Sequence, residues 1–295
     1  MARAAVSGAS GLIGAALSAR LSAGGVEAVP LTRRRGAPGV FWSPESGEVD
    51  AAGLEGLDAV FHLAGVSVAA RWSAGRKAAI RDSRVRGTAL LARALAGLSR
   101  RPKVLVCASA VGWYGSRAEP VDETAAPGTG FLAEVCRDWE AAARPAAEAG
   151  IRVVHARLGM VLSRAGGALQ RMLPAFRLGL GGPIGSGAQG VSWVTLEDCA
   201  AALSFLAFES SLSGPVNVAA PDAVPNAEFA RALGRALHRP AFLPLPAFAV
   251  RLVLGEMAEE LLLSGQRAVP AALTRAGFTF AAPGLDEALR RELGR

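Results

Sequence analysis

Three glycines in a seven-residue turn, Gly8, Gly11 and Gly14, constrain this chain more than any other feature. The apolar residues 4–7 before them predict a short buried strand, and residues 12–23 have the apolar spacing of a helix that ends at glycines 24–25. Gly8 permits a tight turn, Gly11 lets the backbone approach a ligand, and Gly14 lets the helix pack closely on the strand. The chain therefore begins as strand, glycine turn and helix.

The same alternation continues along the chain. Apolar runs predict further strands at residues 26–31, 40–42, 58–64, 104–108, 151–158 and 215–219, and helical spacing predicts helices at 78–98, 131–149, 197–208 and 226–237. Beyond residue 247 we expect two or three helices around a strand at 278–280. Strands that alternate with helices form a parallel sheet covered on both faces. The predicted fold class is therefore α/β, a doubly wound parallel sheet of the Rossmann type.

A glycine turn that opens a helix is a ready site for phosphate groups. The unpaired N–H groups and the partial positive charge of a helix N-terminus attract anions. Directly after a strand, this glycine pattern indicates a dinucleotide whose pyrophosphate lies on the turn. A glycine-rich turn without a ligand is the simpler alternative.

The end of the second predicted strand distinguishes the two nicotinamide dinucleotides. A protein that prefers NAD places an acid there to bind the ribose 2′-hydroxyl. This chain has Thr32 and Arg33, followed by two more arginines and no acid. A guanidinium group matches a 2′-phosphate, so we expect NADP(H); the alternative is a solvated basic loop.

Composition limits the other classes of function. The formal net charge is +7, which is typical of some nucleic-acid-binding proteins, but the arginines are scattered and the aromatic residues do not interleave with them. We therefore expect no nucleic-acid partner. The most apolar late stretch, residues 242–263, carries one arginine and three glutamates, which is too much charge for a membrane span.

The chain start and the cysteines indicate a cytoplasmic protein. Residues 1–3 lead straight into the first strand, so we expect no signal peptide. The three cysteines are odd in number and lack the spacing of metal ligands, so we expect reduced thiols and no metal site. The oligomeric state stays open.

With these residues in place, the chain resembles the extended short-chain dehydrogenase/reductase superfamily, and within it the atypical, epimerase-like branch of SDR39U1- and YfcH-type proteins. The glycine turn 8–14 and the strand 58–65 match motifs of the whole superfamily. The segment 185–198 and the motifs at 254–257, 264–267 and 277–278 resemble the branch itself. The resemblance implies an NADP-binding Rossmann domain at 1–225, with residues 162–192 lining the substrate cleft, and a smaller mixed α/β substrate-side domain at 226–295.

The resemblance also implies which residues contact the cofactor. Arg84 stands where the superfamily has an asparagine; there it reaches a phosphate or is a helix-surface charge. Val161 is expected near the nicotinamide. The full set of expected cofactor residues is Gly8, Ser10, Gly11, Leu12, Ile13 and Gly14 at the pyrophosphate, Thr32 and Arg33 at the 2′-phosphate, Leu63, Ala64 and Gly65 beside the adenosine, and Arg84 and Val161.

The superfamily's catalytic pair is missing. A tyrosine and a lysine four residues apart on one helix face normally move the proton. Here Phe131 and Val135 stand at those positions, the one tyrosine is Tyr114, and no lysine follows Lys103. Ser109 and Tyr114 are the best candidates for substrate hydrogen bonds, and Glu134 is a third candidate, for which an exposed carboxylate is the simpler interpretation.

Two functions follow from this combination. The first is an NADP-dependent oxidoreductase or epimerase that acts on an unknown small molecule with a nonstandard proton donor. The second is a non-catalytic NADP(H)-binding sensor or regulatory protein. The nearly complete cofactor motif and the substrate-side domain favour the first.

Overall fold

The structure, a computed structural model that describes residues 1–294, is built on an eight-stranded sheet. Seven strands are parallel and the edge strand β4 is antiparallel to β3, in the order β12-β8-β6-β5-β1-β2-β3-β4. The strands are β1 (Arg3–Ser7), β2 (Glu27–Thr32), β3 (Val40–Ser43), β4 (Glu48–Val49), β5 (Ala59–His62), β6 (Val104–Ala110), β8 (Arg152–Leu158) and β12 (Gly214–Val218). This sheet confirms the predicted fold class.

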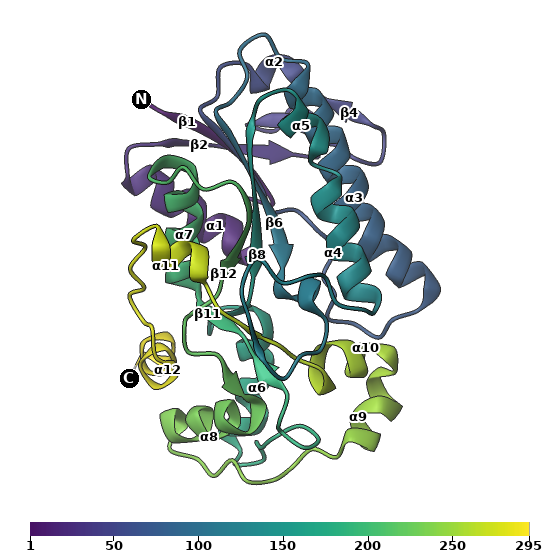
Figure 1. Cartoon of the computed structure of the whole chain (residues 1–295), viewed down its shortest axis with the longest axis vertical. Helices are drawn as coiled ribbons and strands as arrows, with labels where there is room; N and C mark the ends of the chain where they lie inside the picture. The colour runs from purple at the N-terminus through teal and green to yellow at the C-terminus, as the bar shows by residue number, and fades with distance from the viewer. Residues whose placement is uncertain (295) are drawn as a thin grey trace.

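Helices cover both faces of the sheet (Figure 1). Side chains of a strand alternate between faces, so Ala4 and Val6 face one helix layer and Ala5 faces the other. The first layer contains α1 (Leu12–Ala23), α7 (Leu196–Phe208) and α11 (Ala271–Arg275). The second contains α2 (Ala51–Leu54), α3 (Ala74–Ala96), α4 (Phe131–Ala141) and α5 (Arg144–Glu148).

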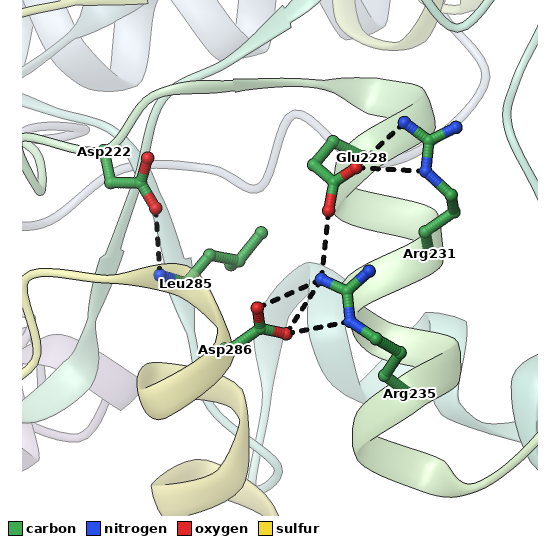
Figure 2. A network of polar contacts seen from close by, with 6 residues as sticks. All are labelled: Asp222, Glu228, Arg231, Arg235, Leu285 and Asp286. Atoms are coloured by element: carbon green, nitrogen blue, oxygen red, sulfur yellow. Dashed lines mark hydrogen bonds and ion pairs between the residues drawn. The ribbon is translucent and has the colours of Figure 1, made fainter.

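A second core lies beyond the carboxyl ends of the strands, around the buried indole of Trp193. It is formed mainly by α6 (Gly167–Arg177), α8 (Asn226–Leu237) and α12 (Leu285–Leu293). Figure 2 shows how polar contacts join α8 to α12: the Arg235 guanidinium binds both Glu228 and Asp286. Three two-stranded sheets support this region, β9 (Met160–Leu162) with β11 (Trp193–Thr195), β10 (Gly190–Val191) with β13 (Val224–Pro225), and β7 (Pro120–Val121) with β14 (Arg267–Ala268).

The last part of the chain returns to the main sheet through short elements. Helices α9 (Ala247–Leu254) and α10 (Glu256–Ala258) lead into a π-helical turn, η2 (Glu259–Leu263). A 3₁₀ turn, η1 (Val111–Tyr114), follows β6. Helix α10 lies near the start of α4, because Glu260 in η2 accepts hydrogen bonds from the first backbone N–H groups of α4.

Several predicted elements differ from the structure. The expected strand at 278–280 is wrong: Phe278 and Phe280 lie in irregular chain and pack ring against ring, with Phe278 also on Phe205. The helix expected over 131–149 is broken into α4 and α5, and Pro145 lies in the first turn of α5. Helix α6 was not predicted, because the glycines at its start and Pro174 inside it are unfavourable to a helix. Within residues 1–294, no helix combines the length and apolar character needed to cross a membrane.

A buried polar contact joins β1 to β5 and to the loop that follows β5. The Ser7 hydroxyl accepts hydrogen bonds from the backbone N–H groups of Leu63 and Ala64, at 3.0 and 3.2 Å. Its own proton is therefore free to be donated to His62 Nδ1, 2.8 Å away. An imidazole that accepts at Nδ1 is neutral, and burial lowers the pKa of His62 from 6.5 to about 4.

We predict that His62 makes stability fall in mild acid. Its pKa is lower in the folded chain than in the unfolded chain, so the unfolded chain takes up the proton first as pH falls. Burial of the neutral imidazole therefore contributes fully to the free energy of unfolding above about pH 6.5. This contribution, about 3 kcal/mol, is lost as the pH falls to about 4. His62→Asn removes this part of the pH dependence, measured by urea unfolding at several pH values.

The matched control is His238→Asn, since His238 is exposed at a positive φ of 53° that asparagine also accepts. This control is expected to keep the pH dependence of the wild type. Equal pH dependence in wild type and His62→Asn would contradict the assignment.

Candidate functional site

The glycine turn presents a helix N-terminus at the carboxyl end of the sheet. Gly8 has a φ of +70°, and its carbonyl oxygen accepts a hydrogen bond from Gly11 N–H at 2.9 Å. Helix α1 begins at Leu12, has no side-chain cap and has no acid in its first turn. The N–H groups of its first turn lack partners within the helix, so a phosphate group would fit them.

Gly14 is required where α1 crosses the turn. A Cβ atom on residue 14 would lie 2.1 Å from the Gly8 carbonyl oxygen, which no backbone adjustment of a few tenths of an ångström relieves. Ser10 and Gly11 are exposed on the outside of the same turn, and Leu12 and Ile13 are half-buried. The structure therefore brings together all six residues expected at the pyrophosphate.

The loop after β5 lies against this turn. Ala64 N is 3.2 Å from the position that a Cβ atom on Gly8 would occupy, and the Ser7 hydroxyl holds both Leu63 and Ala64. Gly65 faces the Arg84 guanidinium, whose carbon lies 3.3 Å from a Cβ built on that glycine. The three residues expected beside the adenosine thus border the glycine turn.

Arg84 supports the loop after β5 from α3. Its Nη1 donates to the carbonyl oxygens of Val66 and Ile80, both at 3.0 Å, and its guanidinium carbon lies 5.0 Å from the Trp139 ring centroid. Burial lowers its pKa, and the neighbouring Cys136 opposes that shift. One guanidinium nitrogen of Arg84 thus binds backbone carbonyl oxygens. The sequence suggests either a phosphate contact or a charge on the helix surface, and neither includes this role.

The end of β2 carries the two residues expected at a 2′-phosphate. The Thr32 hydroxyl accepts a hydrogen bond from Arg34 N–H at 3.1 Å, which shapes the turn. The Arg33 side chain is 72% exposed and lies 3.8 Å from Glu45, itself 85% exposed. Such an exposed pair is weak, so Arg33 is available to an incoming anion.

Val161 lies in β9, beside the same turn. The chain that follows it packs on α1, because Cβ atoms built on Gly166 and Gly167 would contact the Leu12 side chain. Residues from β1, β5, β9 and α1 therefore lie close together at the carboxyl end of the sheet. Arg33 lies at the neighbouring strand end.

Ser109 and Tyr114 are buried beside a pair of opposite charges. The Ser109 hydroxyl donates to Glu140 at 2.7 Å. The Tyr114 hydroxyl accepts from Arg157 Nη1 at 3.0 Å and donates to Asn217 at 2.7 Å. Burial raises the pKa of Tyr114, and the bonds to Arg157 and Asn217 oppose that rise only in part, so the phenol stays protonated near neutral pH.

Sequence reasoning missed the pair of Glu140 and Arg157. Two parallel hydrogen bonds of 2.9 and 3.0 Å join the guanidinium to the carboxylate, with side-chain exposures of 2% and 9% for Arg157 and Glu140. Burial lowers the pKa of Arg157, and the bonds from Glu140 outweigh that effect, so the pKa rises. The sequence did contain a signal for this pair: Glu140 lies on the apolar face of α4, and Arg157 lies in the apolar strand β8.

The start of α4 holds Phe131 where the superfamily has its tyrosine. Its ring packs on Trp72 at 5.0 Å between centroids, and the Lys77 ammonium lies 4.6 Å from the ring centroid. Lys77 also binds Glu256 at 2.7 Å. Val135 is buried, and Glu134, the next residue before it on α4, is exposed. Lys77 is thus a cationic donor at this corner that sequence reasoning did not identify.

The three cysteines lie in the core as thiols. All three are buried and free, and burial raises the pKa of Cys107, Cys136 and Cys199 to about 12 each. Among residues 1–294, no group of three or more histidine, cysteine or acidic side chains is arranged to hold a metal ion.

We predict that Glu140→Ala strongly destabilises the fold. The change leaves the buried Arg157 guanidinium without its partner, which typically costs about 3–5 kcal/mol. Glu134→Ala is the matched control, since it removes a carboxylate from the exposed face of the same helix and should change stability by less than about 0.5 kcal/mol. Urea unfolding measures both, and equal effects would contradict the prediction.

Comparison with known proteins agrees with this geometry. A family model described as the NAD dependent epimerase/dehydratase family matches residues 4–219, and a domain of unknown function, DUF1731, matches residues 245–292. The epimerase family protein Mb2239 of Mycobacterium bovis is 50% identical over 289 residues, which cover 97% of this chain and 95% of that protein.

Two solved structures extend the comparison. The human epimerase family protein SDR39U1, solved with NADPH, is 36% identical, with a TM-score of 0.92 and 99% of each chain covered. A nucleoside-diphosphate sugar epimerase from Corynebacterium glutamicum is 37% identical, with a TM-score of 0.81 over 99% of this chain and 58% of that one. The chain therefore belongs to the NAD dependent epimerase/dehydratase family, as a homologue of the SDR39U1 proteins with a Rossmann-type fold for NAD(P).

Proposed function

We propose that this protein binds NADP(H) and uses it as an oxidoreductase or epimerase on a small molecule, without the tyrosine–lysine pair of its superfamily. The observation that carries the proposal is the open glycine turn beside a β2 end that offers Thr32 and Arg33 and no acid. The human homologue solved with NADPH supports the same cofactor.

The choice of NADP(H) over NAD(H) depends on charge at the end of β2. The ribose 2′-phosphate is a dianion near neutral pH, and an exposed guanidinium can form charge-assisted hydrogen bonds with it. Arg35, by contrast, is engaged with Glu48 and lies over the Phe41 ring at 4.3 Å. Arg33 is therefore the better-placed arginine of the loop for that phosphate.

We expect Arg33→Ala to weaken NADPH binding by about tenfold to a hundredfold, the loss of a charge-assisted contact. Affinity for NADH should stay the same, because NADH lacks the 2′-phosphate. Titration of dinucleotide fluorescence measures both affinities, with Arg35→Ala as the matched control. Wild-type preference for NADH, or an equal loss for both dinucleotides, would contradict the proposal.

The cofactor would supply the hydride, and the chain must then orient a substrate and move a proton. Ser109 and Tyr114 do not offer free hydroxyl groups to a substrate, because they are 2% and 0% exposed and are already bound to Glu140, Arg157 and Asn217. The Lys77 side chain is 31% exposed and carries its protons on an ammonium group bound to Glu256. It can donate a proton or polarise a carbonyl oxygen at the corner where Phe131 replaces tyrosine.

A pair of lysine variants tests catalysis. Aldehydes and ketones are screened by NADPH absorbance, and nucleoside diphosphate sugars by proton NMR. We expect wild-type turnover on one of these classes and a loss of about a hundredfold or more in Lys77→Met, with NADPH affinity unchanged. The matched control is Lys103→Met, since Lys103 is the chain's other lysine and is exposed beside Asp58.

The same experiment separates the second candidate function. The apolar Phe131 and Val135 at the catalytic positions favour a non-catalytic NADP(H) sensor. Tight NADPH binding without turnover on any of these classes would support the sensor and overturn the enzyme. Turnover that Lys77→Met leaves intact would retain the enzyme and remove Lys77 from it.

A further inference from the structure

The C-terminal segment reaches the corner where Lys77 of α3 lies over Phe131 of α4. Helix α10 and the turn η2 belong to residues 245–292, which the domain of unknown function matches. Helix α10 lies next to the start of α4 (Figure 1). Its residues Met257 and Ala258 are buried, at 7% and 0% exposure, so α10 is packed firmly against the rest of the chain.

Three glutamates of this segment have three different partners. The Glu256 carboxylate accepts a hydrogen bond from the Lys77 ammonium at 2.7 Å. Glu259 binds Arg251 at 2.8 Å, within the segment itself. Glu260 accepts hydrogen bonds from the first backbone N–H groups of α4, at 3.0 and 3.3 Å. Two of the three carboxylates therefore connect the C-terminal segment to α3 and α4.

The contact of Glu260 with α4 requires a glycine before the helix. Helix α4 has no side-chain cap of its own, and a Cβ atom on its N-cap residue, Gly130, would overlap the Glu260 carboxylate. The carboxylate also compensates the partial positive charge of the helix N-terminus. Glu260 thus holds the first turn of α4, which carries the Phe131 ring beneath Lys77.

The position of Lys77 depends on Glu256. Within residues 1–294, Glu256 is the one side chain with which the Lys77 ammonium forms a hydrogen bond or ion pair. The ammonium also lies 4.6 Å from the centroid of the Phe131 ring. Because lysine is a compact charge on a long flexible stem, a single carboxylate can decide where that charge lies.

We propose that Glu256 is a positioning residue, and that the C-terminal segment supplies it to complete the site around Lys77. The inference rests on the proposed role of Lys77 as proton donor. The superfamily has its tyrosine and lysine on one helix face, where the helix itself orients both. This chain has Phe131 and Val135 at those positions, and it takes the ammonium from α3 and the carboxylate that orients it from α10.

Matched glutamate variants test the role of Glu256 in turnover. We expect Glu256→Gln to lower kcat about tenfold to a hundredfold, because a displaced donor slows proton transfer. KM and NADPH affinity should stay the same, since Glu256 acts through Lys77. Glu259→Gln removes the same charge from the ion pair with Arg251 and should keep the wild-type kcat. Both glutamates are about half exposed, and far-UV circular dichroism checks that both variants are folded.

Methyl-lysine NMR measures the position of Lys77 without a substrate. The chain has two lysines, so reductive methylation with isotope-labelled formaldehyde labels Lys77, Lys103 and the N-terminus, and the two lysine-to-methionine variants assign the signals. Protons above an aromatic face are shielded, so the Lys77 methyl signal should lie upfield of the signal from the exposed Lys103. Glu256→Gln should move it towards the Lys103 signal, and Glu259→Gln should leave it in place.

The two measurements separate failure of this inference from failure of the proposed function. An unchanged kcat or an unmoved Lys77 methyl signal in Glu256→Gln would overturn the positioning role and leave the enzyme in place. Equal losses of kcat in Glu256→Gln and Glu259→Gln would also overturn it, because both glutamates would then act through the stability of the segment. If wild type turns over no substrate class, the enzyme fails, and the NMR signal alone decides whether Glu256 positions Lys77.

Discussion

The buried pair of Glu140 and Arg157 is the interaction on which the rest of the structure depends. Two charges removed from water are tolerated only when each finds its partner and its remaining hydrogen bonds. Here the guanidinium contacts Glu140, the Tyr114 hydroxyl and the Trp113 ring, and the carboxylate also binds Ser109. These contacts require β6, α4, β8 and η1 to be in place together.

The network continues from the sheet into the last part of the chain. Asn217 on β12 accepts from Tyr114 and donates to Val269 O at 2.9 Å. Glu123 accepts from the backbone N–H groups of Asn217 and Ala272, at the start of α11. Ser109 and Tyr114 were expected to bind a substrate through their hydroxyl groups. In the structure these hydroxyl groups belong to a hydrogen-bond network that joins the C-terminal region to the sheet.

The parts that the sequence predicts are those controlled by local chemistry. Apolar runs and the spacing of Gly8, Gly11 and Gly14 locate most of the main strands and the turn, since each depends on residues close in the chain. The strand expected at 278–280 was wrong because its aromatic residues pack as single rings on α7 rather than pairing with a neighbour. Helix α6 was missed because the glycines at its start and Pro174 oppose helix locally, and tertiary packing of Leu169, Leu173 and Phe176 outweighs them.

In the candidate site, too, the residues of a local motif could be predicted and the long-range contacts could not. The expected cofactor residues follow from a short motif, whereas Glu140 meets Arg157 across 17 positions and Lys77 meets Glu256 across 179. No local pattern encodes which charges will be paired across such separations. Burial could be inferred for Glu140 from the apolar residues around it on α4, but its partner could not.

The segment 247–263 has one side against the candidate site and another side that is exposed. On its inner side, Glu256 binds Lys77 and Glu260 caps the first turn of α4, both beside Phe131. On its outer side, Phe248 and Leu252 are exposed. The carboxylates of Glu256 and Glu260 thus position the Lys77 ammonium and the first turn of α4 from the same segment. Because one segment makes both contacts, its packing couples the position of Lys77 on α3 to the start of α4.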